Sequence, residues 1–246
     1  MQHRGGARLR GIGGLNESSL HAALKSWYGR PGDLFEQPVE GFVVDIVRSA
    51  GATGDMPLLI EIQTGNFTAI RGKLGRLLAE NRVLLVHPVA HEKWILRWTA
   101  DDAPIGRRKS PKRGRVEDLF RELVRMPGLV AHPNLSLEVV LIREEDILRD
   151  DGAGSWRRRR WSVADRRLLG VVGAVRFDTP ADLAALVPPE LPRPFTNHDL
   201  ALALGCPIGL AQKMTYSLVR MGMLVDAGKR GHVRLFEAVS EGSRNS

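Results

Sequence analysis

The chain has 246 residues, of which 43% are hydrophobic and 26% charged, values that are typical of a folded protein and exclude wholesale disorder. The formal net charge is +8, and most of the excess lies from Trp156 onward, where 14 Lys and Arg stand against 8 Asp and Glu. Such an imbalance indicates a polyanionic partner, because cations placed on phosphates release counterions, although a solvated basic surface would have the same composition.

Several classes of protein are disfavoured. Cys206 is the only cysteine, which leaves no disulfide framework and no cysteine zinc site. Residues 1–14 are basic and Gly-rich without the apolar core of a secretory signal, and no apolar run approaches the roughly 18 residues of a membrane span. The sequence therefore predicts a cytoplasmic protein without a membrane segment.

In chain order, residues 1–15 are expected to form a flexible arm, and Asn16 to cap a helix that ends near Tyr28. Apolar runs predict three strands at residues 35–39, 42–47 and 58–63, a helix at 66–81, and two further strands at 83–86 and 94–98. This order predicts an α/β fold with a mixed sheet flanked by helices.

The second half of the chain is less regular. Residues 100–115 are predicted to be a polar, basic loop, 116–125 a short helix and 135–142 a strand, with Ile147 near a small helix. The first domain is expected to span residues 16–165, and a connecting segment with a Pro-rich end is expected at 166–194.

Two acidic residues interrupt otherwise apolar strands, Asp45 in the second and Glu61 in the third. A carboxylate on a buried strand has a large desolvation cost unless a cation compensates it, and Mg²⁺ prefers such oxygen ligands. Glu61 and Gln63 share one face of their strand, and Lys73 on the following helix would lie near the same edge. The alternative is a structural ion pair of each acid, for example with Arg48 or Arg71.

The segments Phe42-Val-Val-Asp-Ile and Leu58-Leu-Ile-Glu-Ile-Gln-Thr resemble the PD-(D/E)XK nuclease superfamily over roughly residues 16–86. The resemblance implies a restriction-endonuclease-like fold, with a helix, a β-hairpin, a third strand, a helix and a fourth strand. It also implies that Asp45 and Glu61 bind Mg²⁺ or Mn²⁺, assisted by Glu17 in the first helix. The superfamily usually has Lys where Gln63 stands, and in some members that Lys has moved to the following helix, where Lys73 lies.

Residues 195–246 have the pattern of a winged helix-turn-helix domain: a helix capped by Thr196, a Gly205-Cys206-Pro207 turn, a second helix at 208–221 and a basic hairpin. The second helix offers polar side chains that could contact bases or phosphates, namely Gln212, Lys213, Thr215, Tyr216 and Arg220. The hairpin adds Lys229, Arg230 and Arg234.

The sequence therefore leads to two hypotheses. The first is a Mg²⁺-dependent nuclease, with Asp45, Glu61, Gln63, Lys73 and Glu17 at its site and DNA as its partner. The second is a non-catalytic, DNA-binding regulator whose nuclease-like core is structural. A homodimer stays open in both.

Overall fold

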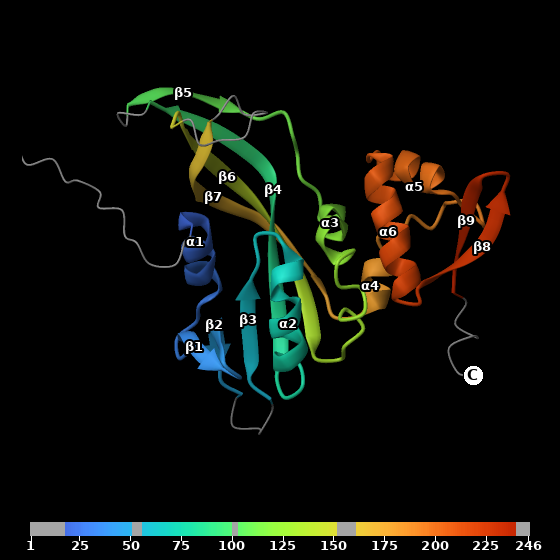
Figure 1. Cartoon of the computed structure of the whole chain (residues 1–246), viewed down its shortest axis with the longest axis horizontal. Helices are drawn as coiled ribbons and strands as arrows, with labels where there is room; N and C mark the ends of the chain where they lie inside the picture. The colour runs from blue at the N-terminus through green and yellow to red at the C-terminus, as the bar shows by residue number, and fades with distance from the viewer. Residues whose placement is uncertain (1–17, 51–55, 100–102, 152–160, 240–246) are drawn as a thin grey trace, which may run out of the picture.

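The computed structural model describes residues 18–50, 56–99, 103–151 and 161–239 (Figure 1). Its strands are β1 (Leu34–Val39), β2 (Phe42–Arg48), β3 (Leu58–Ile62), β4 (Arg82–Trp98), β5 (Pro104–Lys109), β6 (Leu135–Arg149), β7 (Ser162–Phe177), β8 (Leu224–Arg230) and β9 (Val233–Ala238). Its helices are α1 (Ser19–Tyr28), α2 (Phe67–Leu77), the 3₁₀ turn η1 (Val116–Leu119), α3 (Phe120–Leu123), α4 (Pro180–Ala184), α5 (Asn197–Leu204) and α6 (Ile208–Arg220).

Strands β1 to β7 form one large mixed sheet in the order β1-β2-β3-β4-β6-β7, with β5 paired to the far half of β4. The pairs β3–β4 and β4–β6 are parallel and the others antiparallel. Parallel neighbours need a crossover connection, and α2 supplies it between β3 and β4. The prediction of a mixed sheet flanked by helices is confirmed.

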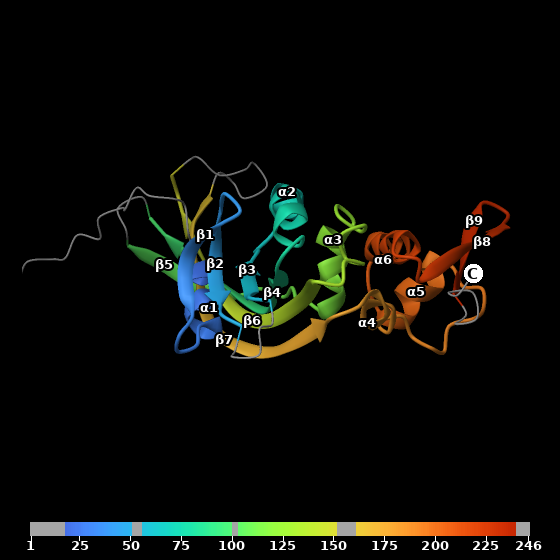
Figure 2. The ribbon, with the colours of Figure 1, turned by 90° about the horizontal axis from the view of Figure 1, so that it is seen from below.

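Both faces of the sheet are covered. On one face, Phe67 and Leu74 of α2 pack with Leu59 and Leu85 of the sheet, and Figure 2 shows α2 standing clear of the strands on that side. On the other face, Leu20 of α1 belongs to a second cluster that includes Ile46, Ile60 and Val86. Neighbouring strand residues thus contribute to both clusters, as the pleat of a strand requires.

The first helix begins slightly later than expected. Ser18 is its N-cap, and the Ser18 hydroxyl accepts the His21 N–H at 3.3 Å. The predicted cap, Asn16, lies outside the described residues.

The predicted strands at 83–86 and 94–98 are one 17-residue strand, β4. Pro88 lies inside this strand, at a position where β4 donates no backbone hydrogen bond to a neighbouring strand. The Val86 carbonyl points toward β3, where it accepts the Gln63 N–H at 2.8 Å, and position 88 faces the same way beyond the end of β3. A proline is therefore accommodated without the loss of a ladder hydrogen bond.

The second half of the sheet also differs from the predictions. Residues 104–109, expected in a loop, form β5. Strand β6 continues to Arg149, through the position where a small helix was expected near Ile147. Strand β7 crosses the position 165/166, where the first domain was expected to end. Together with the end of β4 they form a projecting arm, here defined as residues 92–98, 104–109, 143–149 and 162–168, at the upper left of Figure 1.

Helix α6 of the C-terminal unit, residues 195–239, packs against α3. Thr196 caps α5 in a reciprocal pair with Asp199, and Gly205 ends that helix with φ of +56°, a conformation that glycine adopts without strain. Buried residues of α3 and α6, including Phe120 and Met214, belong to the same hydrophobic core. No helix in the described part of the chain is both long and apolar enough to cross a membrane.

Candidate functional site

Asp45 and Glu61 lie on adjacent strands, as predicted, at the point where the strands separate. The antiparallel ladder between β2 and β3 ends at the pair Ile46 and Ile60. One residue further along each strand come Asp45 and Glu61. There, the Ile62 N–H donates a hydrogen bond to Oδ2 of Asp45 at 2.8 Å. The side chain of Asp45 thus takes a backbone donor that a longer ladder would have used.

Asp45 is held as an anion. Its Oδ2 also lies 3.0 Å from Nε2 of His21, which α1 presents. Burial by itself would raise the pKa of Asp45, but the contacts with His21 and the Ile62 N–H, together with the charge of Lys73, outweigh burial and lower it. Asp45 therefore stays charged at neutral pH.

Glu61 is only 4% exposed and has the opposite tendency. Burial raises its pKa from 4.5 to about 7, and the negative charge of Asp45 adds to this, although Lys73 acts against it. The Lys73 ammonium lies 2.5 Å from Glu61 Oε1 and also donates to the Val43 carbonyl at 2.5 Å. Two acids at facing positions of adjacent strands thus have pKa values displaced in opposite directions, and perturbed pKa values of this kind cluster at functional sites.

The predicted site residues are brought together only in part. Lys73 contacts Glu61 as expected, whereas the side-chain amide of Gln63 donates to the Gly65 carbonyl. Lys73, carried on α2, is thus the cation that contacts Glu61. Glu17 lies outside the described residues.

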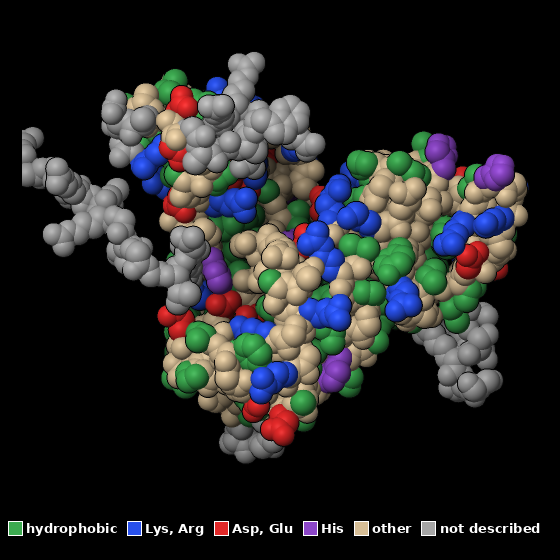
Figure 3. Space-filling view, in the orientation of Figure 1, with side chains coloured by type: hydrophobic (Ala, Val, Ile, Leu, Met, Phe, Trp, Pro, Cys, Tyr) green, Lys and Arg blue, Asp and Glu red, His purple; other side chains and the backbone are tan. Residues whose placement is uncertain are grey.

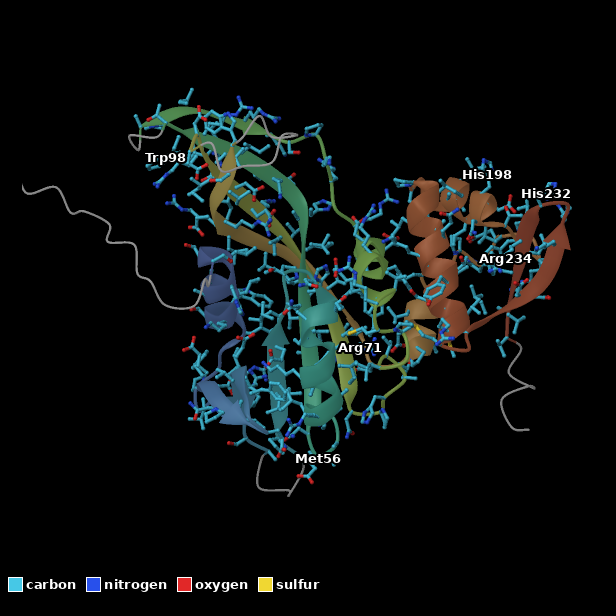
Figure 4. The ribbon with its side chains drawn as sticks, in the orientation of Figure 1. Met56, Arg71, Trp98, His198, His232 and Arg234 are labelled. Carbon is cyan, nitrogen blue, oxygen red and sulfur yellow. The ribbon has the colours of Figure 1, made fainter. Side chains whose placement is uncertain are left out.

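The alternative ion pairs take a different form. Arg48 does not pair with either acid, because its guanidinium bonds both carboxylate oxygens of Asp33 at 2.8–2.9 Å. Arg71 is exposed on α2 and is labelled in Figure 4. An ion pair at Glu61 does exist, but Lys73 forms it.

His21 was not among the predicted site residues. It is four residues after Glu17, and residues at this spacing share a helix face. The helix face on which Glu17 was expected to assist therefore also carries His21, and this spacing could have identified it. The other histidine near the site, His87, is buried against Phe67 and contacts the Gln63 carbonyl through Nδ1 at 2.8 Å. His87 therefore fixes the backbone after β3.

The donor set suits a hard divalent cation. Among the described residues there is no cluster of three or more His, Cys, Asp or Glu side chains that could enclose a metal. Mg²⁺, however, needs only one or two carboxylates, because it retains water or takes substrate phosphate oxygens for its other positions. Asp45 and Glu61 could provide two such ligands, and the pKa of Glu61 is raised chiefly because burial penalises its charge, which Lys73 offsets only in part.

A second candidate surface lies on α6. Gln212, Tyr216 and Arg220 are exposed and follow one another at four-residue intervals, so they form one stripe along the helix, with Lys213 half-exposed beside it. Thr215, predicted to be exposed, is 1% exposed, and its hydroxyl donates to Asn197 at 2.7 Å. Thr215 therefore joins α5 to α6 and is not available to a ligand.

The hairpin continues this surface. Lys229, Arg230 and Arg234 are all exposed. A groove of about 380 Å³ separates Tyr216 and Arg220 from Arg234, and a neighbouring one of about 430 Å³ is lined by His198, Lys229 and His232. Figure 4 shows His198, His232 and Arg234 at the same outer end of the unit.

Residues 18–178 match a family described as "Domain of unknown function (DUF8091)". The chain belongs to this family. An uncharacterized protein of Treponema pallidum (strain Nichols) is 31% identical over 235 residues, which cover 96% of this chain and 90% of the relative. No solved structure matches. Asp45, Glu61, Lys73 and His21 all lie within the matched region, whereas the C-terminal unit lies after it.

Proposed function

We propose that the protein is a Mg²⁺-dependent nuclease that hydrolyses phosphodiester bonds, with DNA as its substrate. The observation that carries the proposal is the placement of Asp45 and Glu61 side by side where β2 and β3 separate, with Lys73 on Glu61. These are two carboxylates and a cation at the end of a strand, within a large mixed sheet.

The order of elements supports this proposal. A helix, two antiparallel strands, a third strand, a helix and a parallel fourth strand follow one another from α1 to β4. This is the succession that the resemblance to the PD-(D/E)XK superfamily implies, and Asp45 and Glu61 occupy the positions of its two acids. The restriction-endonuclease-like fold is thus proposed for residues 18–98.

The roles of the residues follow from their surroundings. Asp45 and Glu61 would hold the ion, which when bound polarises a phosphodiester and lowers the pKa of an attacking water. His21 and the Ile62 N–H fix the Asp45 carboxylate in position. Lys73 keeps a positive charge beside both acids and is the group placed to orient water or stabilise charge on the phosphate.

The test is incubation of the full chain with labelled single-stranded and duplex DNA and with RNA, in the presence of Mg²⁺, Mn²⁺ or a chelator. Asp45→Asn and Glu61→Gln should each abolish metal-dependent cleavage while the fold is retained, and the exposed Glu190→Gln should cleave normally. Lys73→Met should slow cleavage more than Gln63→Ala, because Lys73 contacts Glu61 and Gln63 does not. Cleavage by the Asp45→Asn/Glu61→Gln double variant would refute the proposed site.

One observation favours a second candidate, a DNA-binding regulator without catalysis. Lys73 already forms an ion pair with Glu61 at 2.5 Å, and this contact is also what a purely structural ion pair would show. A titration with Mn²⁺, followed by electron paramagnetic resonance, separates the two functions. The nuclease requires binding that is lost in Glu61→Gln, whereas a regulator requires none.

The C-terminal unit is proposed to be a winged helix-turn-helix domain that binds DNA. Its two helices meet at Gly205, and the Phe195–Phe236 bridge joins the start of α5 to the hairpin. The exposed stripe on α6 and the basic hairpin face the two grooves described above. A helix flanked by a basic wing is the arrangement that enters a major groove while the wing contacts phosphates.

A further inference from the structure

A basic segment leads from the arm to the C-terminal unit. Residues 107–115 read Arg-Arg-Lys-Ser-Pro-Lys-Arg-Gly-Arg, six cations without an acid. The six cations are here called the basic track: Arg107, Arg108, Lys109, Lys112, Arg113 and Arg115. The first five are exposed and Arg115 is half-buried.

The track has a fixed path. β5 is paired with β4 up to Lys109, and beyond it the Ser110 N–H donates to the Lys93 carbonyl at 2.7 Å and the Gly114 N–H to the Ala90 carbonyl at 2.8 Å. At its end, the Arg115 guanidinium donates to the Leu204 carbonyl, which closes the C-terminus of α5. The backbone that carries the cations is therefore held in place before any ligand arrives, which lowers the entropic cost of binding.

The acids near the track are too few to neutralise it. Glu92 is shared by Lys109, Arg113 and the β6 residue Arg143 at 3.0–3.8 Å, and Glu145 pairs with Arg107. Arg108 and Lys112 form no ion pair with any other residue that the structure describes. Two carboxylates thus pair with six track cations. The nearby Asp118 and Glu122 pair with Arg121 and Arg125 instead, so an excess of positive charge is left for a partner.

The track borders a cleft that lies between the candidate active site and the C-terminal unit. The cleft encloses about 750 Å³, and its cations are Lys112, Arg113 and Arg115 of the track with Lys93 and Arg121. Its lining also includes the acids Asp118 and Glu122, Pro207 and Leu210 of the C-terminal unit, and Thr64, three residues after Glu61. Figure 3 shows Lys and Arg side chains gathered along the notch between the arm and the C-terminal helices.

We propose that the basic track binds the phosphate backbone of the nucleic acid held by the C-terminal unit, along the cleft that Thr64, three residues after Glu61, also lines. From Arg107 to Arg115 the chain can extend up to roughly 27 Å, at about 3.4 Å per residue. This length corresponds to about eight phosphates of one strand, which favours a polymer over a single nucleotide. The inference rests on the proposed function, because it gives the substrate a second binding surface beyond the C-terminal unit.

The experiment measures binding of the full chain to a fluorescein-labelled duplex of about 30 base pairs by anisotropy over a salt series, with a chelator present so that nothing is cleaved. The test variant is Arg108→Ala/Lys112→Ala, which removes the two track cations without an ion pair. The matched control is Arg30→Ala/Arg82→Ala, which removes the same charge from exposed positions elsewhere on the fold. Circular dichroism melts check that both variants are folded.

Each phosphate contact contributes about 0.9 to the slope of log K against log salt. The test variant should therefore have a slope shallower by about 1.8 and roughly 30-fold weaker affinity near 0.15 M salt, whereas the control should keep the wild-type slope. Equal slopes in wild type, test variant and control would overturn the proposal, as would absence of binding by the wild type at low salt. Because no cleavage is measured, a track that binds DNA in a chain that does not cut it would still support the proposal.

Discussion

The stability of Glu61→Gln relative to the wild type should increase with pH, although the substitution removes a charged group from the ion pair with Lys73. In the folded chain, burial raises the pKa of Glu61 from 4.5 to about 7, whereas in the unfolded chain the carboxyl is solvated and titrates near its ordinary value. Folding thus favours the protonated form. The contribution of Glu61 to stability is present below about pH 4.5 and is lost as the pH rises through about 7.

The magnitude follows from the displacement of the pKa. A tenfold change in proton affinity is worth about 1.4 kcal/mol, so ionising Glu61 in the folded state costs about 3 kcal/mol by pH 8. Glutamine keeps the shape without the charge. The free energy of unfolding of Glu61→Gln minus that of wild type should therefore increase by about 3 kcal/mol between pH 4.5 and pH 8. Contributions of titrating groups that do not interact with Glu61 cancel in this difference.

The assay is urea unfolding, followed by tryptophan fluorescence, at several pH values with a chelator. Glu190→Gln, at an exposed position, is the matched control and should give a difference that does not change with pH. A difference for Glu61→Gln that is equally flat would refute the assignment of Glu61 as a buried and poorly compensated carboxylate. Repeating the series with Mg²⁺ should stabilise the wild type more at pH 8 than at pH 6 and leave Glu61→Gln unchanged, because a cation competes with the proton for the same oxygens.

Three further predictions concern packing and recognition. Gly114→Ala should destabilise the fold by about 1–3 kcal/mol in chemical denaturation, since a Cβ there would lie 2.6 Å from the Ala90 carbonyl oxygen. Gly72→Ala is the control: a Cβ there meets open space on the exposed side of α2, so this substitution should stabilise the fold by up to about 1 kcal/mol. Thr215→Val should cost about 1–2 kcal/mol by the same measurement, because it removes the buried hydroxyl that joins α5 to α6. Gln212→Ala should change the preference among duplex sequences in a selection assay, whereas Lys229→Ala should weaken binding to all sequences alike.

Local sequence patterns were enough to predict the neighbourhood of the candidate site. A single acid in each of two apolar runs placed Asp45 and Glu61 on adjacent strands, and the following helix brought Lys73 to them. The cap at Thr196 and the glycine turn likewise placed both helices of the C-terminal unit. These features depend on residues close together in the chain, which pattern reasoning treats well.

The arm could not be predicted, because its strands contain the charges expected of loops. Lys93 of β4 lies between Glu144 and Asp146 of β6 at 2.5 and 3.1 Å, and Arg107 of β5 binds Glu145 at 2.6 Å. Each of these charges has its partner on another strand that is distant in sequence, so no window along the chain reveals the pairing. The contact of His21 with Asp45 was missed for the same reason, since it joins a helix to a strand 24 residues away.

The two parts of the proposal place different demands on the fold. A carboxylate at position 61 lowers stability at neutral pH, and an apolar residue of similar size would continue the run Leu58-Leu-Ile without that cost. Conversely, the track cations lie on the surface, where their loss would cost little stability. A variant that loses DNA affinity but not stability therefore reports on the track, whereas one whose relative stability rises with pH and which loses metal binding reports on the carboxylates. Because the readouts are independent, the metal site and the nucleic-acid path can be accepted or rejected separately.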